Sequence, residues 1–188
     1  MRLGIISDSH DHLHHLRPAI DFLSSRTEVL LCCGDLCSPF VVDELKKYPG
    51  PVHIVFGNND ADLFRITKKC DDRVQAHGEF IVLEFNGFKV AMNHFDNIAL
   101  PIAASKQYGL VCFGHNHRYS LEHFGETIAL NPGAIMGVAF GKSGAEPVPV
   151  TFATFDTDSK EARLWRVPTE SGTSGWEYSW NTQTEPSR

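Results

Sequence analysis

Residues 2–10 read RLGIISDSH, a short apolar run that leads directly into aspartate, serine and histidine. An apolar run of this length with polar residues at its end is typical of a strand buried on both faces. In layered α/β proteins, ligands bind beyond the ends of such strands. The stretch therefore predicts a buried strand that delivers Asp8 and His10 to a site at one edge of a sheet.

The same arrangement recurs four more times along the chain. Each time an apolar run ends in a polar stretch, and these stretches read GDLC, GNND, HFDN and GHNH. The four runs occupy residues 28–33, 52–56, 88–93 and 109–113. Five runs of this kind predict five buried strands whose ends carry polar side chains.

Helical patterns separate these strands. The first has one apolar stripe formed by Leu13, Leu16, Ile20 and Leu23. We expect Asp11 to cap this helix and Pro18 to distort it, and we expect further helices within residues 38–48 and 99–108. Strands that alternate with helices predict an α/β fold.

Two other regions indicate antiparallel hairpins. Residues 80–93 contain a strand, an Asn86-Gly87 turn and a second strand, and residues 149–156 and 162–167 alternate like a strand pair. Antiparallel pieces beside the alternating strands favour a sandwich of two sheets over a single open sheet.

The end of the chain differs in composition from the rest. Residues 1–167 are expected to form one domain, and residues 168–188 are polar and rich in Ser, Thr and Gly, which predicts a mobile tail. Trp176, Tyr178 and Trp180 share one face of an extended segment, so docking of the tail on a neighbouring surface stays open.

Composition limits the function. The chain has 188 residues, of which 42% are hydrophobic and 21% charged, and a net charge of -6, which argues against a surface that coats nucleic acid or an anionic membrane. It contains no apolar run of ~18 residues and no signal-peptide core, so we expect a cytoplasmic protein. The five cysteines form no CxxC pair and are expected to be reduced, buried thiols.

Seven potential metal ligands follow the five strands: Asp8, His10, Asp35, Asn58, His94, His115 and His117. Carboxylate, imidazole and amide donors together suit Mn²⁺ first, with Fe, Zn²⁺ or Ni²⁺ as alternatives. Taken singly, the aspartates could be helix caps and the histidines surface residues. His12, His14 and His15 extend the same stretch and are expected to be solvated.

The ordered motifs D-x-H, G-D, G-N-x-D, a lone His, and G-H-x-H followed by NPGA resemble the calcineurin-like metallophosphoesterases, in particular the short single-domain bacterial and archaeal phosphodiesterases. The resemblance covers residues 1–167. It implies a four-layer α/β/β/α sandwich of two mixed sheets flanked by helices, with two metal ions between the sheets. By motif position the ligands of the first ion would be Asp8, His10 and His117. Those of the second would be Asn58, His94 and His115, and Asp35 would bridge both ions.

Three further residues are expected at this site, at or beside its strand ends. Much of the family has a histidine at the position of Asn59, where it protonates the leaving group, and this chain departs from that pattern. Asp60 is expected to brace the Asn58 loop through hydrogen bonds. A family glycine after the lone histidine is replaced by Phe95, which would narrow the cleft, stack on an aryl group or point into the core.

The resemblance implies a binuclear-metal phosphodiesterase of small phosphate esters that uses a metal-bridging hydroxide as nucleophile. Alternatives are a phosphomonoesterase or a nuclease on the same site, or a protein-interaction scaffold of the same fold. A long nucleic acid would require a basic track, and the chain offers only the cluster of Lys68, Lys69 and Arg73. Association with a second copy of the chain stays open.

Overall fold

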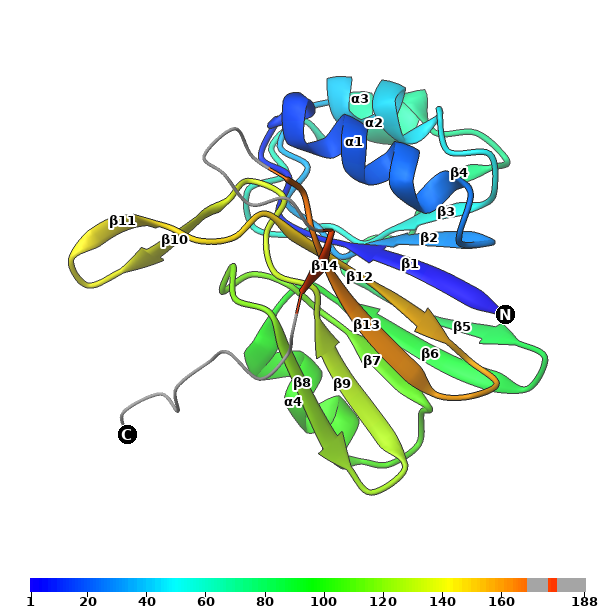
Figure 1. The fold of residues 1–188 in the computed structure, drawn as a ribbon. Coiled ribbons are helices and arrows are strands. Elements are labelled where there is room, and N and C mark those ends of the chain that lie inside the picture. Colours follow the sequence, from blue (N-terminus) through cyan, green and yellow to red (C-terminus); the bar gives the residue numbers. More distant parts are fainter. Residues whose placement is uncertain (169–175, 179–188) are drawn as a thin grey trace.

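The computed structural model describes residues 1–168 and 176–178. Two mixed β-sheets lie face to face, and a small third sheet projects from them (Figure 1). The first sheet has the strand order β14-β13-β12-β1-β2-β3-β4. Its strands are β1 (Arg2–Ile6), β2 (Val29–Cys32), β3 (Val52–Ile54), β4 (Val74–Ala76), β12 (Thr151–Asp156), β13 (Glu161–Arg166) and β14 (Glu177–Tyr178).

The second sheet has the strand order β5-β6-β7-β9-β8. Its strands are β5 (Phe80–Phe85), β6 (Phe88–Asn93), β7 (Leu110–Cys112), β8 (Ser120–Phe124) and β9 (Thr127–Asn131). Strands β1-β2-β3-β4 run parallel in the first sheet and β6-β7-β9 in the second, while the other neighbouring strands, including β1 and β12, pair antiparallel. Parallel neighbours place their carboxyl ends at one edge, which is what a site built from strand ends requires.

Helices cover the outer faces of both sheets. The first sheet carries α1 (Leu13–Ser24), α2 (Phe40–Leu45) and α3 (Leu63–Lys69), and the second carries α4 (Asp96–Ala104) (Figure 1). The four-layer α/β/β/α sandwich of two mixed sheets is therefore confirmed. No helix among the described residues is both long and apolar enough to cross a membrane.

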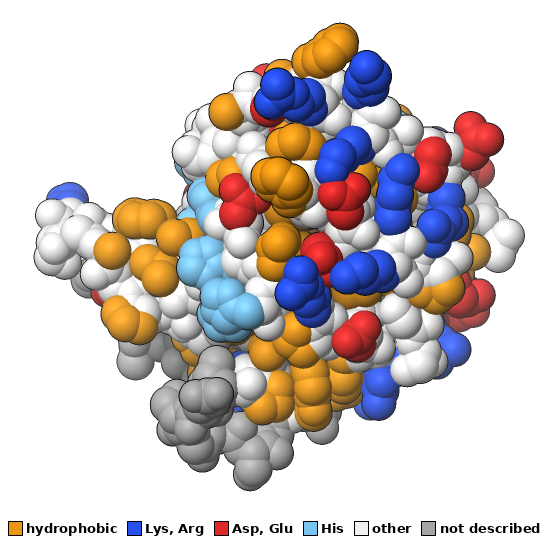
Figure 2. Space-filling model, turned by 90° about the horizontal axis from the view of Figure 1, so that it is seen from above, with side chains coloured by type: hydrophobic (Ala, Val, Ile, Leu, Met, Phe, Trp, Pro, Cys, Tyr) orange, Lys and Arg blue, Asp and Glu red, His pale blue; other side chains and the backbone are white. Residues whose placement is uncertain are grey.

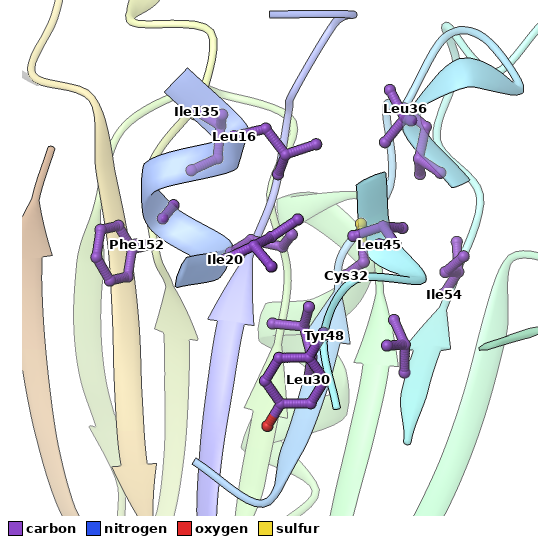
Figure 3. Close-up of a cluster of buried hydrophobic side chains, with 14 of the residues drawn as sticks. Leu16, Ile20, Leu30, Cys32, Leu36, Leu45, Tyr48, Ile54, Ile135 and Phe152 are labelled. Carbon is purple, nitrogen blue, oxygen red and sulfur yellow. The ribbon is translucent and has the colours of Figure 1, made fainter. Parts of the chain in front are cut away.

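Three apolar clusters hold the layers together. One lies between α1, α2, α3 and the first sheet and includes Leu16, Ile20 and Tyr48 (Figure 3). A second lies between the two sheets, and a third lies between α4 and the second sheet. Every residue of β2 and β7 belongs to one of these clusters, as do Leu3, Ile5 and Ile6 of β1, which explains the apolar sequence of these strands. All five cysteines are free thiols, and three of them are buried.

Local structure agrees with the sequence in one turn and differs at one helix start. The Asn86-Gly87 turn joins β5 to β6 with both residues at positive φ, as the hairpin signal predicts. The first helix is preceded by His12, which makes no side-chain cap, so the expectation that Asp11 caps it is wrong. Asp11 instead accepts a hydrogen bond from the Ser38 hydroxyl and joins the loop after β1 to the loop after β2.

A hairpin that the sequence did not indicate projects from the body. Strands β10 (Val138–Gly141) and β11 (Gly144–Pro147) pair only with each other (Figure 1). Their sequence VAFGKSGAEP alternates weakly and contains two glycines and a proline, so pattern analysis did not indicate the hairpin. The hairpin begins close to His117, whose Nδ1–H donates to the Val138 carbonyl.

Residues 176–178 differ from the mobile tail expected from the sequence. The Trp176 ring stacks on Phe22 of α1 with 4.7 Å between ring centroids, and β14 pairs with β13. The Tyr178 ring lies edge-on to Tyr119, and the Arg166 guanidinium lies over its face. These three residues are docked, which was the alternative left open. Trp180 and the rest of the predicted tail lie outside the described residues, and the domain end at residue 167 stays a prediction.

Truncation after Pro168 should destabilise the fold more than truncation after Tyr178. The shorter chain lacks the Trp176 ring that covers Phe22, and loss of this half-buried aromatic should cost about 2 kcal/mol. For a domain of this size that corresponds to roughly 4–8 °C in melting temperature. Thermal unfolding of both truncated chains measures the difference. Equal melting temperatures would show that the Trp176 contact contributes nothing to stability.

Candidate metal centre

The ends of five strands from both sheets meet at one edge of the sandwich. Asp8 and His10 follow β1, Asp35 follows β2, and the remaining predicted ligands follow β3, β6 and β7. Backbone hydrogen bonds join these loops, because the Asp8 N–H donates to the Gly34 carbonyl and the His10 N–H to the Asp35 carbonyl. The sandwich therefore brings together residues that are more than a hundred positions apart in the sequence.

Four of the predicted ligands form one tight group: Asp8, His10, Asp35 and His117. One donor atom from each lies within 4.8 Å of the others. His10 Nε2 lies 3.2 Å from His117 Nε2 and 3.4 Å from Asp35 Oδ2, and His117 Nε2 lies 3.3 Å from Asp8 Oδ1. Both carboxylates are fully buried. Two carboxylates and two imidazoles at this separation form a candidate binding site for a cation.

The other three predicted ligands lie next to this group. His94 Nε2 is 3.4 Å from Asp35 Oδ2 and 4.0 Å from Asp8 Oδ1, so it faces the same carboxylates from the side of β6. The His94 and His115 rings are 5.2 Å apart, and His115 Nδ1 lies 2.9 Å from Asn58 Oδ1. Asp35 thus stands between His10 on one side and the group of His94, His115 and Asn58 on the other.

The imidazole tautomers fit a bound cation. His94 Nδ1–H donates to the Cys33 carbonyl at 2.7 Å, and His117 Nδ1–H donates to the Val138 carbonyl. A carbonyl only accepts, so each ring carries a proton on Nδ1 and directs Nε2 at the carboxylates. Burial lowers the pKa of both imidazoles, but the nearby carboxylates, Asp35 for His94 and Asp8 for His117, outweigh it and raise the pKa above its usual value. His94 Nε2 is buried without a hydrogen-bond partner among the described residues. Outer-shell carbonyls of this kind are the usual partners of metal-binding histidines.

Asn59 is bound to Asp35 rather than directed at the open site. Its backbone N–H donates to Asp35 Oδ1 and its side-chain NH₂ donates to Asp35 Oδ2, both at 2.8 Å. Burial alone would raise the pKa of the Asp35 carboxyl, but the His10 and His94 imidazoles and the Asn59 amide hold it well below its usual range. Asp35 is therefore ionised and fixed in orientation.

Asp60 joins the loops after β2 and β3. Its carboxylate accepts hydrogen bonds from the backbone N–H groups of Asp35 at 3.0 Å, Cys37 at 2.9 Å and Gly57 at 2.8 Å. Burial raises the pKa of Asp60, and the hydrogen bonds from Gly57 and Cys37 oppose that shift. The Asp60 side chain therefore holds the backbone of Asp35 in position.

The loops that carry the ligands are conformationally strained. Five of the seven predicted ligands have positive φ angles, between 41° and 71°: Asp8, His10, Asp35, His115 and His117. Residues other than glycine rarely adopt this region, although Asn, Asp and His do so more readily than most, and an enforced case costs roughly 1–3 kcal/mol. Such strain concentrates at functional sites, where the surrounding structure enforces it. No sequence pattern indicated this strain.

Two motif glycines are explained by close approach. A Cβ atom on Gly57 would collide with Asp35 Oδ1 and with the His94 ring. A Cβ atom on Gly114 would collide with the Ser7 hydroxyl and with Asp8 Oδ2. The glycines of G-N and G-H therefore leave room for the buried carboxylates, which is a reason beyond their preference for turns.

Aromatic side chains border the site on two sides. Phe95 lies edge-on to His94 and His115, with ring centroids 5.1 and 5.0 Å away. Phe140 of the β10–β11 hairpin lies 5.7 Å from the His117 ring and is 63% exposed. A cavity of about 290 Å³ opens beside His117, between Arg118 and the residues at 146–149. Figure 2 shows histidine side chains gathered next to hydrophobic ones on this face.

Comparison with known proteins agrees with this geometry. Residues 1–160 match the model of the calcineurin-like phosphoesterase superfamily domain. The chain is 30% identical over 168 residues to a phosphodiesterase of Methanocaldococcus jannaschii, which covers 87% of this chain and 97% of that protein. A solved archaeal phosphodiesterase superposes with a TM-score of 0.78 at 27% identity, covering 89% of this chain and all of the other.

A more distant structure shares the fold alone. The Zn²⁺ complex of Vps29 from Entamoeba histolytica superposes with a TM-score of 0.64 at 21% identity, covering 92% of this chain and 95% of that one. Because the family model spans most of the sequence, the chain belongs to the calcineurin-like phosphoesterase superfamily. It is a metal-dependent phosphoesterase, and the group of Asp8, His10, Asp35 and His117 is its candidate metal-binding cluster.

Replacement of Asp60 by alanine should destabilise the metal-free protein strongly. The change leaves three backbone N–H groups without their charged acceptor, which should cost about 3 kcal/mol or more. Asp62→Ala is the matched control, because Asp62 caps the exposed start of α3 and its loss should cost about 1 kcal/mol. Denaturant unfolding in the presence of a chelator compares the two. A smaller effect for Asp60 than for Asp62 would contradict the bracing role.

Proposed function

We propose that this protein is a binuclear phosphodiesterase that hydrolyses small diesters carrying an aromatic group. The observation that supports the proposal most strongly is Asp35, a buried, ionised carboxylate whose Oδ2 lies 3.4 Å from Nε2 of both His10 and His94. A carboxylate in that position is suited to bridge two cations, one on each side.

The ligand sets follow from the two sides of Asp35. Asp8, His10 and His117 would hold one ion, and they already lie together. Asn58, His94 and His115 would hold the other, with Asn58 contributing its amide oxygen. The mixture of carboxylate, imidazole and amide donors favours Mn²⁺, and Fe, Zn²⁺ and Ni²⁺ are the alternatives. We keep a cytoplasmic location as a further prediction.

The chemistry divides between the ions and the chain. When bound, two such ions would lower the pKa of a water molecule that attacks phosphorus and would offset the charge of the phosphate ester. Asp35 and Asp8 are buried, so they remain in place while the ester binds above them. Asn59 and Asp60 position Asp35, the first through its carboxylate oxygens and the second through its backbone.

Asn59 has consequences for the leaving group. Its NH₂ group donates to Asp35 and an amide does not protonate an alkoxide near neutral pH, so this side chain supplies no general acid. A well-placed general acid is typically worth ~10²–10⁴-fold in rate. The enzyme should therefore prefer leaving groups that depart without protonation, such as aryl oxides.

The aromatic border favours an aromatic substituent on the other ester arm. Phe140 is exposed beside His117 and is directed toward no other aromatic ring among the described residues except that imidazole. A ring of the substrate that lies beside His117 would be able to stack on the exposed Phe140 ring. Stacking on an aromatic side chain is worth ~1–3 kcal/mol for nucleobases.

Hydrolysis of two p-nitrophenyl diesters tests the function and this specificity together. With Mn²⁺ added to chelator-treated protein, both phenyl and ethyl p-nitrophenyl phosphate should be hydrolysed, the phenyl ester with the lower KM. Phe140→Ala should raise KM for the phenyl ester by roughly 5-fold or more, as expected for the loss of ~1 kcal/mol of stacking. It should change the ethyl ester little.

Controls separate the two parts of the proposal. Phe140→Tyr keeps a ring and should restore the low KM for the phenyl ester, whereas Phe140→Leu should not. Failure of the native protein to hydrolyse either diester with any of the proposed ions would overturn the phosphodiesterase function. Hydrolysis of both esters with equal KM would overturn only the aromatic preference, and faster turnover of p-nitrophenyl phosphate would favour a phosphomonoesterase.

A further inference from the structure

Three histidines outside the proposed catalytic ligands gather at the start of α1. His12 immediately precedes the helix, and His14 and His15 lie in its first turn. One nitrogen from each lies within 4.8 Å of the others, and the ring centroids are 4.0 to 5.8 Å apart. These three residues are here named the α1 histidine cluster. The sequence predicted separately solvated side chains, whereas in the structure the three rings lie next to one another.

The hydrogen bonds of the cluster leave nitrogen lone pairs for a ligand. His15 Nδ1 lies 3.0 Å from the Ile135 carbonyl, and because a carbonyl only accepts, this nitrogen carries the proton. His15 Nε2 is then a free lone pair in a ring whose orientation is fixed, which is the arrangement of histidines that bind metals. His12 Nδ1 is buried and has no hydrogen-bond partner among the described residues. His14 is exposed and free to rotate toward the other two.

The donor set defines the class of ion. Three neutral imidazoles without a carboxylate suit Zn²⁺, Ni²⁺ or Cu²⁺ and suit Mg²⁺, Ca²⁺ or Mn²⁺ poorly. A tetrahedral ion with Zn–N bonds of ~2.0–2.1 Å requires the nitrogens to approach to about 3.4 Å, so side-chain rotation must close the remaining gap. The fourth position would face solvent, because His14 is exposed.

Two features limit the affinity of such a site. The positive end of the α1 dipole disfavours a cation, and so would two ions at the neighbouring catalytic centre. Asp11 offsets part of this charge, because it lies in the same loop and its carboxylate is exposed. The cluster should therefore release its ion more readily than the centre built on the buried carboxylates of Asp8 and Asp35.

We propose that the α1 histidine cluster binds a third metal ion, Zn²⁺ or a similar imidazole-seeking ion, at a site separate from the catalytic centre. The two sites share no ligand. The cluster consists of neutral donors at a helix start, whereas the centre includes two buried carboxylates at strand ends. Substitution within the cluster should consequently remove one ion and leave the others bound.

Equilibrium dialysis against Zn²⁺ tests the proposal on the full chain. The native protein should bind one equivalent of Zn²⁺ more than His14→Ala. In this variant the affinity of the cluster for Zn²⁺ should fall by more than 10–100-fold, the usual effect of losing an outer-shell partner. His123→Ala is the matched control, because His123 is an exposed histidine on β8, away from α1, and its loss should change nothing. Circular dichroism checks that both variants are folded.

The outcomes separate this site from the catalytic centre. Three equivalents in the native protein and two in His14→Ala support the third ion together with the binuclear centre. One equivalent of Zn²⁺ in the native protein and none in His14→Ala would support the cluster and contradict the proposed binuclear centre. Equal zinc binding by the native protein and His14→Ala would overturn the third site, and so would an equal loss in His123→Ala.

Discussion

Burial of two carboxylates is the constraint on which this structure depends. Asp8 and Asp35 are fully buried and face imidazole nitrogens, with Asp35 ionised despite the loss of solvent. A buried charge is costly unless it is paired or coordinates a metal. The loops around these two side chains consist largely of groups that fix or neutralise them. Asn59 and Asp60 fix Asp35, and the His115 backbone N–H donates to Asp8. Bound cations would supply further stabilisation, which would connect folding of the site to its proposed chemistry.

The sandwich supplies the rigidity that this arrangement requires. Parallel strands from both sheets deliver their ends to one edge, and three apolar clusters fix the layers on which these strands lie. Positive φ angles at five predicted ligands are then tolerated because hydrogen bonds between the loops enforce them. Rigid support of this kind favours a centre that exists before the ions bind, and it explains why the motif glycines cannot carry a side chain.

The sequence predicts the central part of the molecule well, because that part has a simple pattern. Continuous apolar runs indicate β1, β2 and β7, and the polar residues that follow them lie together as expected. It fails where the signal is weak or depends on distant contacts. The β10–β11 hairpin is rich in glycine, and the docking of Trp176 depends on Phe22, far away in the sequence. The role of Asn59 was hidden for the same reason, since its partner Asp35 follows another strand.

X-ray diffraction from crystals grown with Mn²⁺, recorded for anomalous scattering, would locate the ions relative to Asp35. If Asp35 bridges two ions, the anomalous map should contain two peaks ~3.5–4 Å apart, the spacing usual for binuclear centres, with Asp35 between them. Asp8, His10 and His117 should surround one peak, and Asn58, His94 and His115 the other. A single peak, or a pair of peaks that Asp35 does not bridge, would contradict the bridging role of Asp35.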